Sequence, residues 1–382
     1  MPTETALERV LKPTRGVTGL FDWYVDSING NDNNNGRTPE HAFATLAKLA
    51  TCGVSTSLNK IGLAANSVFR EAFKFPVAGL ADRPIILGAY GSGAKPQLLG
   101  SMPIASNAWT SLSGQEYTTP TTLSNPNSGG PTPAITWIDP AGLKTSIYKG
   151  KPGSLSVNQY VIANGLFHVN IGRAPSAADR FEVGQRTPVN IEVSHTVIDG
   201  LDIRYSQAYG IAANVTAPIT DTTIQNCELS WNTADAINFN AGAGVATNSL
   251  VQNCWIHDQP SDGGGGGDGF SGHGATTGKV ISCLFQRCGK NGFNASEDGA
   301  WTVYNVTFDA CDCIIFGGTQ NGGPHYVYRC QFYGEKPGGN GSQPILYFQV
   351  GHSGTKGFFY NTASPAAPAA PTCAVSGRMT AC

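Results

Sequence analysis

The block Asn226-Cys227-Glu228-Leu229 returns one repeat later as Asn253-Cys254-Trp255-Ile256, and the pair defines a pattern that extends over much of the chain. Four further copies are Gly200-Leu201-Asp202-Ile203, Ser282-Cys283-Leu284-Phe285, Asn305-Val306-Thr307-Phe308 and Arg329-Cys330-Gln331-Phe332. Successive copies begin 26, 27, 29, 23 and 24 residues apart. Because each block carries apolar residues two apart, as a β-strand does, this period predicts that each repeat is one coil of a parallel β-helix.

Stacked coils place equivalent side chains in columns, since neighbouring strands lie about 4.8 Å apart. One column is predicted to face the core and consists of Leu201, Cys227, Cys254, Cys283, Val306 and Cys330. Four of the ten cysteines are therefore predicted to be small buried hydrophobic residues and not metal ligands or disulfide partners.

The other cysteines have different predictions. Cys288 and Cys311 share a second column, where we expect stacked thiols, with a disulfide as the alternative. Cys373 and Cys382 could close a loop at the end of the chain. The spacing Cys311-x-Cys313 has no second ligand pair, which argues against a zinc site.

Composition excludes several classes of protein. Of the 382 residues, 13% are charged and 40% are hydrophobic, which argues against a coiled coil and against intrinsic disorder. The net charge of −2 and the lack of a dense Lys/Arg run argue against nucleic-acid binding. No apolar run reaches the roughly 20 residues of a membrane-spanning helix. The first residues lack a basic start followed by an apolar core, so we expect no signal peptide.

The chain is predicted to have three parts. Residues 1–20 form an N-terminal attachment peptide, residues 21–363 the β-helix, and residues 364–382 a Pro/Ala-rich tail. A β-rich excursion interrupts the coils at about residues 101–190, where the repeat is lost. Its aromatic residues are predicted to form a small core, with sugar stacking as the alternative; they are Trp109, Trp137, Tyr148 and Tyr160.

An N-terminal capping helix is predicted to cover the open end of the solenoid, which would otherwise expose unpaired strands. Thr38 suits the N-cap and Pro39 the first helical position. Phe43, Leu46 and Leu49 would then share one apolar face. The asparagine-rich turn before this segment, Asn29 to Gly36, is read as a plain turn, with calcium binding as the alternative.

The run from residue 61 to 100 resembles the opening of pectate-lyase-like right-handed parallel β-helix proteins. The segments that carry the resemblance are VFRE, PVAGLADRPIILGAYG and KPQLLG. With the capping segment and the later coils, it covers roughly residues 21–360. The resemblance implies an all-β, right-handed parallel β-helix. It implies no single activity, since the superfamily includes lyases, glycoside hydrolases, epimerases, phage tailspikes and non-catalytic members.

The densest group of polar residues follows a five-glycine run that lengthens one coil. Asp268 and His273 are the predicted acid/base pair, and Asp235, at the equivalent position one coil earlier, is the second carboxylate. Arg287 or Lys290 would neutralise a uronate. Stacked acids also suit a calcium site, and Asx turns that satisfy the backbone are the structural alternative. A structural histidine is the alternative for His273. The predicted substrate-binding residues are Asn240, Asn294, Glu297, Asp298, His257 and Trp255.

Family motifs match this region only in part. Gly272-His273-Gly274 is similar to the Gly-His-Gly of polygalacturonase-type hydrolases, but their Asn-Thr-Asp, Asp-Asp and Arg-Ile-Lys motifs are missing. Asp268 is similar to an aspartate of calcium-dependent family 9-like pectate lyases, whose later paired aspartates would fall near Lys290-Asn291. Mannuronan epimerases have Gly-Phe-Asp-Pro-His where this chain has Gly269-Phe270-Ser271-Gly272-His273. The resemblance implies sugar binding and completes no known catalytic set.

Three functions remain open. The favoured one is a glycan-recognising phage virion protein, tailspike-like and homotrimeric, that binds a host surface polysaccharide with or without cleaving it. The alternative is a polysaccharide lyase or glycoside hydrolase that acts on acidic polysaccharide outside a virion. The third is a purely structural β-helix. The expected location is the virion or the extracellular space, and calcium is the one cofactor that the sequence suggests.

Overall fold

The computed structural model describes residues 21–104, 106, 108–126, 134–213, 216–239, 245–260, 266–295, 299–311, 314–318, 325–333, 346–350 and 357–360. The predicted attachment peptide and the Pro/Ala-rich tail lie outside these residues. So do three predicted substrate-binding residues, Asn240, Glu297 and Asp298, and the cysteines Cys313, Cys373 and Cys382.

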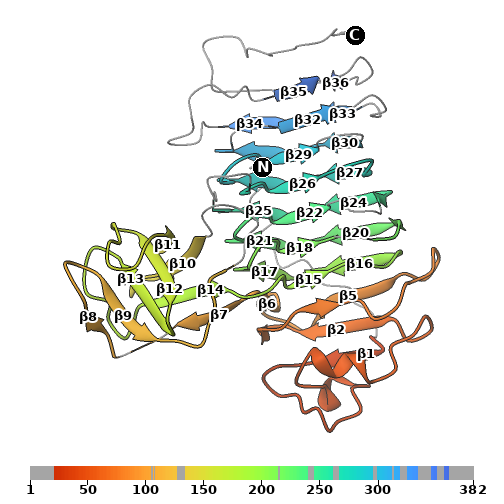
Figure 1. Cartoon of the computed structure of the whole chain (residues 1–382). Coiled ribbons are helices and arrows are strands. Elements are labelled where there is room, and N and C mark those ends of the chain that lie inside the picture. The colour runs from red at the N-terminus through yellow and green to blue at the C-terminus, as the bar shows by residue number, and fades with distance from the viewer. Residues whose placement is uncertain are drawn as a thin grey trace, which may run out of the picture.

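Three parallel sheets wind into a right-handed solenoid, as Figure 1 shows. Sheet 1 has ten strands: β1 (Trp23–Val25), β2 (Lys60–Ala64), β5 (Ile85–Tyr90), β16 (Thr196–Asp199), β20 (Thr222–Gln225), β24 (Ser249–Gln252), β27 (Thr277–Ile281), β30 (Ala300–Tyr304), β33 (His325–Tyr328) and β36 (Gly357–Tyr360). Sheet 2 has eight: β3 (Val68–Phe69), β6 (Gln97–Leu99), β17 (Asp202–Arg204), β21 (Glu228–Ser230), β25 (Trp255–His257), β28 (Leu284–Gln286), β31 (Thr307–Asp309) and β34 (Gln331–Tyr333).

Sheet 3 also has eight strands: β4 (Phe73–Lys74), β15 (Val189–Asn190), β18 (Ile211–Ala212), β22 (Ile237–Phe239), β26 (Phe270–Gly272), β29 (Phe293–Ala295), β32 (Ile314–Gly318) and β35 (Leu346–Val350). A short pair, β19 (Ile219–Thr220) and β23 (Ala246–Thr247), precedes sheet 1 in two coils. The all-β parallel β-helix predicted from the repeats is thus confirmed. No helix within the described ranges is long and apolar enough to cross a membrane.

Left-handed residues form the corners of the coils. Between sheets 1 and 2, Gly200 has a φ of 74°, and the same column continues through Asn226, Asn253, Ser282, Asn305 and Arg329 with φ between 52° and 56°. After the strands of sheet 2, a second column with φ between 51° and 59° holds Tyr205, Trp231, Asp258, Arg287 and Ala310. Asparagine and glycine tolerate this conformation best, which explains why they recur at the start of the blocks.

The core consists of the columns that the repeats predicted. Leu201, Cys227, Cys254, Val306 and Cys330 are fully buried, and Cys283 nearly so. In the next columns, Phe270 stacks on Phe293 with ring centroids 4.9 Å apart, and Phe285 on Phe308 at 5.1 Å. Every cysteine within the described residues is a free thiol, including Cys288 and Cys311. The stacked thiols expected at that pair, with a disulfide as the alternative, stay a prediction.

The prediction of an N-terminal capping helix is wrong. The segment forms only two short 3-10 turns, Pro39–His41 and Ala47–Ala50. Two carboxylates bind the N–H groups that an α-helix would have used: Asp32 accepts from Ala44 and Thr45, and Glu71 accepts from Leu46 and Ala47. The apolar residues of the segment, Phe43, Leu46 and Leu49, are nevertheless buried in the solenoid core.

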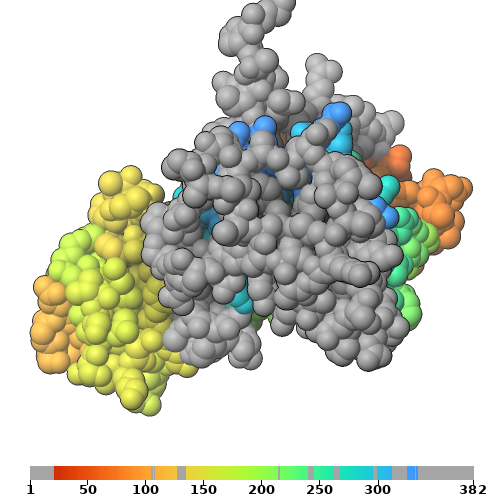
Figure 2. Space-filling view, turned by 90° about the horizontal axis from the view of Figure 1, so that it is seen from above, coloured from red at the N-terminus to blue at the C-terminus, as the bar shows by residue number. Residues whose placement is uncertain are grey.

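A separate lobe leaves the solenoid after β6 and returns before β15 (Figure 1). Its strands form one sheet in the order β7 (Ser101–Ile104), β14 (Arg180–Gly184), β10 (Ala134–Ile138), β11 (Lys144–Lys149), β12 (Gln159–Ala163), β13 (Leu166–Asn170), β9 (Tyr117–Pro120) and β8 (Thr110–Ser111). Tyr160 lies in the lobe's core, and Trp109 and Trp137 pack against it. Viewed from above in Figure 2, the lobe stands to one side of the solenoid.

Candidate functional site

The outer face of sheet 2 carries charged side chains in two adjacent columns. Asp202, Glu228 and Trp255 occupy equivalent positions on β17, β21 and β25. Two residues further along the same strands, Arg204 and His257 occupy the next outward column. The residue between them on each strand points into the core, because side chains alternate along a strand.

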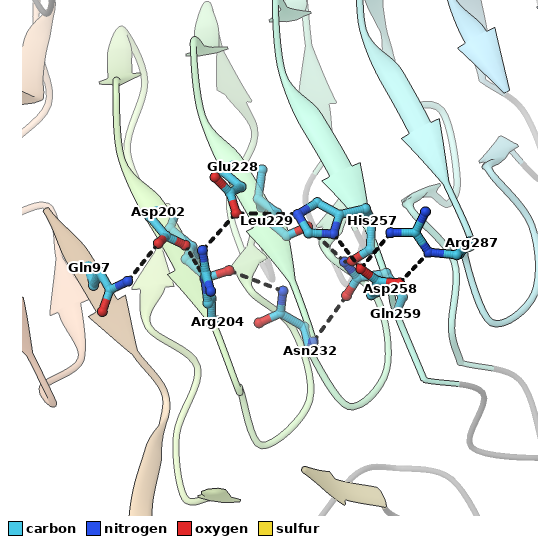
Figure 3. Close-up of polar contacts among 11 residues, drawn as sticks. Gln97, Asp202, Arg204, Glu228, Leu229, Asn232, His257, Asp258, Gln259 and Arg287 are labelled. Carbon is cyan, nitrogen blue, oxygen red and sulfur yellow. Dashed lines mark hydrogen bonds and ion pairs between the residues drawn. The ribbon is translucent and has the colours of Figure 1, made fainter. Parts of the chain in front are cut away.

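A continuous set of polar contacts crosses these strands, as Figure 3 shows. Gln97 Nε2 donates to Asp202 Oδ2 at 2.9 Å. Arg204 then joins two carboxylates: its Nε donates to Asp202 Oδ1 at 2.5 Å and its Nη2 to Glu228 Oε1 at 2.7 Å. His257 Nε2 lies 3.3 Å from the same oxygen of Glu228. The guanidinium therefore holds a pair of stacked acids together.

His257 lies between two acids and beneath an indole ring. Its Nδ1 lies 2.6 Å from Asp258 Oδ2, and Trp255 stacks on the imidazole with ring centroids 3.8 Å apart. Arg287 closes this end of the set with two hydrogen bonds to Asp258, at 2.6 and 2.8 Å. Both contacts of the imidazole to carboxylates are hydrogen bonds at once only when the ring carries two N–H groups.

Buried amides fix the corners from which these side chains project. Gln259 Nε2 donates to the carbonyls of Leu229 and His257, and its Oε1 accepts from the backbone N–H of Asn232. Asn232 in turn accepts from the backbone N–H of Ser206. Both amides are almost inaccessible to solvent. Satisfied buried groups of this kind make the charged face above them rigid.

The two stacked acids differ in their affinity for a proton. Burial raises the pKa of the Asp202 carboxyl, and the charge of Glu228 adds to this against the opposing charge of Arg204. Burial acts on Glu228 in the same direction, but the hydrogen bond from His257 and the charge of Arg204 outweigh it and lower the pKa of Glu228. Neighbouring carboxyls with pKa values shifted apart are the arrangement that acid/base catalysis uses.

The lobe packs against this face at a small apolar seam. Leu99, Tyr205 and Trp231 of the solenoid cluster with Ile138 of β10. From β11 of the lobe, Lys144 extends over the two rings of the seam: its Nζ lies 5.4 Å from the centroid of Tyr205 and 5.8 Å from that of Trp231. One border of the charged face is thus formed by the lobe.

The structure places Asp235 and Asp268 elsewhere, in the turn between sheets 2 and 3. They are neighbours on successive coils, because the backbone N–H of Asp268 donates to Asp235 Oδ1 at 3.1 Å. Asn238 donates to the other oxygen of Asp235. The oxygens of Asp268 accept from the backbone and side chain of Asn291 and from Asn294.

All four carboxylate oxygens of this pair therefore accept N–H groups already, and both side chains are buried. Burial together with the neighbouring Asp268 raises the pKa of Asp235 to about 8. A calcium ion would have to displace these donors, so the bonding favours the turn-ladder interpretation over a calcium site. Within the described residues, no cluster of three or more His, Cys, Asp or Glu side chains is placed to hold a metal.

The other predicted residues divide between the two regions. His273, Lys290 and Asn294 lie near the turn ladder: His273 Nε2 is 2.9 Å from Ser271 Oγ, the backbone N–H of Lys290 donates to Gly267, and Asn294 donates to Asp268. His257, Trp255 and Arg287 lie on the outer face of sheet 2. The catalytic roles predicted for Asp235, Asp268 and His273 stay predictions.

Sequence reasoning missed the acids of sheet 2 and Lys144. Asp202 and Glu228 stand at the third position of two aligned repeat blocks, so a search for outward columns with charged residues on successive coils could have found them. Arg204 was detectable in the same way, two positions later. Lys144 has no such signal, because the repeat period carries no information about the position of the lobe.

Comparisons with known proteins agree with the fold. The family model described as "Right handed beta helix region" matches residues 189–347. The structure of XylC with xylose aligns with a TM-score of 0.56 at 12% identity, over 89% of this chain and 69% of that one. A search of curated proteins gave no match.

Two further solved structures align more loosely. An alginate lyase from Paenibacillus sp. str. FPU-7 has a TM-score of 0.39 at 10% identity, over 84% of this chain and 97% of that one. Pectate lyase Pel9A has a TM-score of 0.38 at 11% identity, over 88% and 78%. The family model and the alignment with XylC thus support the right-handed parallel β-helix fold that the resemblance implied.

Proposed function

We propose that the chain is a glycoside hydrolase that binds a polysaccharide along the outer face of sheet 2 and cleaves it with Asp202 and Glu228. The observation that carries the proposal is the carboxyl pair on successive coils, one with a raised and one with a lowered pKa, bridged by Arg204. Glu228 and Arg204 each keep 19% of their side-chain surface exposed, so they remain within reach of a ligand.

In the proposed reaction, the Glu228 carboxylate attacks the anomeric carbon while Asp202 gives its proton to the departing glycosidic oxygen. Water then attacks the glycosyl ester, with Asp202 taking the proton of the water, and Glu228 is released as a carboxylate. Neighbouring strands lie about 4.8 Å apart, which matches the short separation of about 5 Å in retaining enzymes. The half-buried Trp255, next to Glu228 in the same column, offers a ring for a neighbouring sugar.

The test is product analysis on a panel of polysaccharides with the wild type, Glu228→Gln and Asp202→Asn. The wild type should release reducing ends without absorbance at 235 nm, and each variant should be slower by roughly 10²–10⁴-fold. Glu192→Gln is the matched control, because this acid lies in an exposed ion pair with Lys74. Absorbance at 235 nm in the wild type would show elimination instead, and variants as active as the wild type would remove these residues from the mechanism.

The catalytic residues predicted from the sequence give the competing proposal at the turn ladder. There Asp268 and His273 would act as acid and base, with Asp235 as second carboxylate and Lys290 neutralising a uronate. Loss of activity in Asp268→Asn and His273→Gln, together with a requirement for added calcium after chelation, would support it over the outer face of sheet 2.

The virion setting is a separate proposal. A tailspike-like protein that recognises a host surface glycan would use the same outer face, since binding a chain of sugars requires only an exposed row of polar and aromatic groups. Light scattering tests the assembly: a homotrimer supports a virion spike, and a monomer supports an enzyme that acts alone outside a virion.

A further inference from the structure

Lys144 is a half-buried cation without an anionic partner. Its ammonium lies over the rings of Tyr205 and Trp231 and, among the described residues, makes no ion pair. Charges that are partly removed from water are normally paired. Contact with two aromatic faces compensates only part of that cost.

The nearby acids already have other partners. Asp202 and Glu228 are bound by Arg204, and Asp258 by Arg287. Burial and the positive charge of Arg204 lower the pKa of Lys144 to about 8, against the opposing charges of Asp202, Glu228 and Asp258. Two cations, one from the lobe and one from the solenoid, therefore lie close enough to repel each other, and the acids near Lys144 form their ion pairs with arginines.

We propose that Lys144 binds the carboxylate of a uronic acid residue in the glycan, so that the lobe completes the site on sheet 2 and selects acidic polysaccharides. The inference rests on the proposed function for the location of the glycan. An incoming carboxylate would pair with the ammonium and relieve its repulsion with Arg204. The rings of Tyr205 and Trp231 hold the ammonium at the border of the charged face.

The experiment compares each acidic polymer with its own carboxyl-reduced form, which keeps the backbone and removes only the charge. Polygalacturonate, alginate and glucuronoxylan serve as probes, with affinity measured by calorimetry. Wild-type protein should bind at least one acidic polymer roughly tenfold or more tightly than its reduced form. Lys144→Met should abolish this preference and Lys144→Arg should keep most of it. Lys149→Met is the matched control, since Lys149 is an exposed lysine at the other end of the same strand.

The outcomes separate this inference from the proposed hydrolysis. Equal binding of acidic and reduced polymers by the wild type, binding of neither, or an unchanged preference in Lys144→Met overturns the role of Lys144. Wild-type protein that prefers the acidic form through Lys144 and releases no reducing ends overturns the hydrolase and supports the inference. If the wild-type protein cleaves the acidic and the reduced forms equally well, the proposed hydrolysis is supported and the role of Lys144 is overturned.

Discussion

Two pairs of acids are stacked on successive coils, and they lie in different chemical surroundings. Asp202 and Glu228 share an outward column of sheet 2 and are joined by the guanidinium of Arg204. Asp235 and Asp268 lie in a turn and are joined by N–H groups of the backbone and of asparagine side chains. The first pair is balanced by charge, and the second is satisfied by neutral donors.

The difference lies in what each arrangement allows. Neutral donors satisfy a buried acid but leave its charge unbalanced, so the pKa of Asp235 rises to about 8 and the pair is most stable when it holds a proton. Beside Arg204, the pKa of Glu228 is lowered by its hydrogen bond from His257 and by the guanidinium charge, while burial raises the pKa of Asp202. Stacking of carboxylates is therefore insufficient to indicate catalysis in a β-helix; the ion pairs with Arg204 and the partial exposure of Glu228 distinguish the two pairs.

Removing the cation tests the first pair most strongly. Arg204→Met leaves Asp202 and Glu228 adjacent without a counter-charge, and breaking a largely buried ion pair costs roughly 3–5 kcal/mol. We expect the free energy of unfolding to fall by about 3 kcal/mol, measured by denaturant titration at pH 7. Arg83→Met, at an exposed arginine of the same solenoid, is the control. A loss below about 1 kcal/mol would mean that the acids do not depend on this guanidinium.

The sequence predicted the solenoid well because the repeat period is a direct consequence of its geometry. The inward cysteine column, the corner asparagines and the adjacency of Asp235 and Asp268 all follow from aligning repeats. The capping helix failed because Thr38 and Pro39 are local signals, whereas Asp32 and Glu71 reach the same segment from elsewhere in the chain.

Prediction of the site was limited in the same way, because the sequence shows local signals and repeats but not contacts made from elsewhere in the chain. Asp268 follows a glycine-rich loop that marks its coil in the sequence, whereas Glu228 stands in an aligned block with no loop or motif beside it. Column alignment specifies which residues are neighbours, and it contains enough information to pair Asp202 with Glu228, although that pair was missed. It contains no information about Lys144, whose position depends on how a separate lobe packs against the solenoid.

Neutralising one acid of the second pair should have the opposite effect on stability. In Asp235→Asn, the new amide oxygen can still accept from the backbone of Asp268, and Asn238 can turn so that its unpartnered Oδ1 accepts the new N–H group. We expect the free energy of unfolding to rise by roughly 1–3 kcal/mol near pH 8.

The gain should depend on pH in a defined direction. Native Asp235 holds its proton up to about pH 8, whereas an unfolded aspartate releases it near pH 4. Unfolding therefore releases a proton between these values, and wild-type stability falls as pH rises through this window. In thermal unfolding from pH 4 to 9, the difference in stability between Asp235→Asn and the wild type should grow as pH rises. If the two stability curves run parallel with pH, Asp235 does not hold a proton in the native protein. If Asp235→Asn folds normally but loses activity, the turn ladder is favoured as the catalytic site.

The smallest expected effect is at the solvent-facing end of the sheet 2 network. Arg287 is predicted from the sequence to neutralise a uronate, yet in the structure both of its hydrogen bonds go to Asp258, and its side chain is 49% exposed. Exposed ion pairs contribute about 0–1 kcal/mol. Arg287→Ala should therefore change the free energy of unfolding by less than about 1 kcal/mol and the cleavage rate by less than about tenfold, since Asp258 keeps its contact with His257. Reducing-end kinetics at low and high salt measure the second effect. A larger loss of rate, confined to acidic polymers, would show that Arg287 leaves Asp258 when substrate binds and shares the uronate with Lys144.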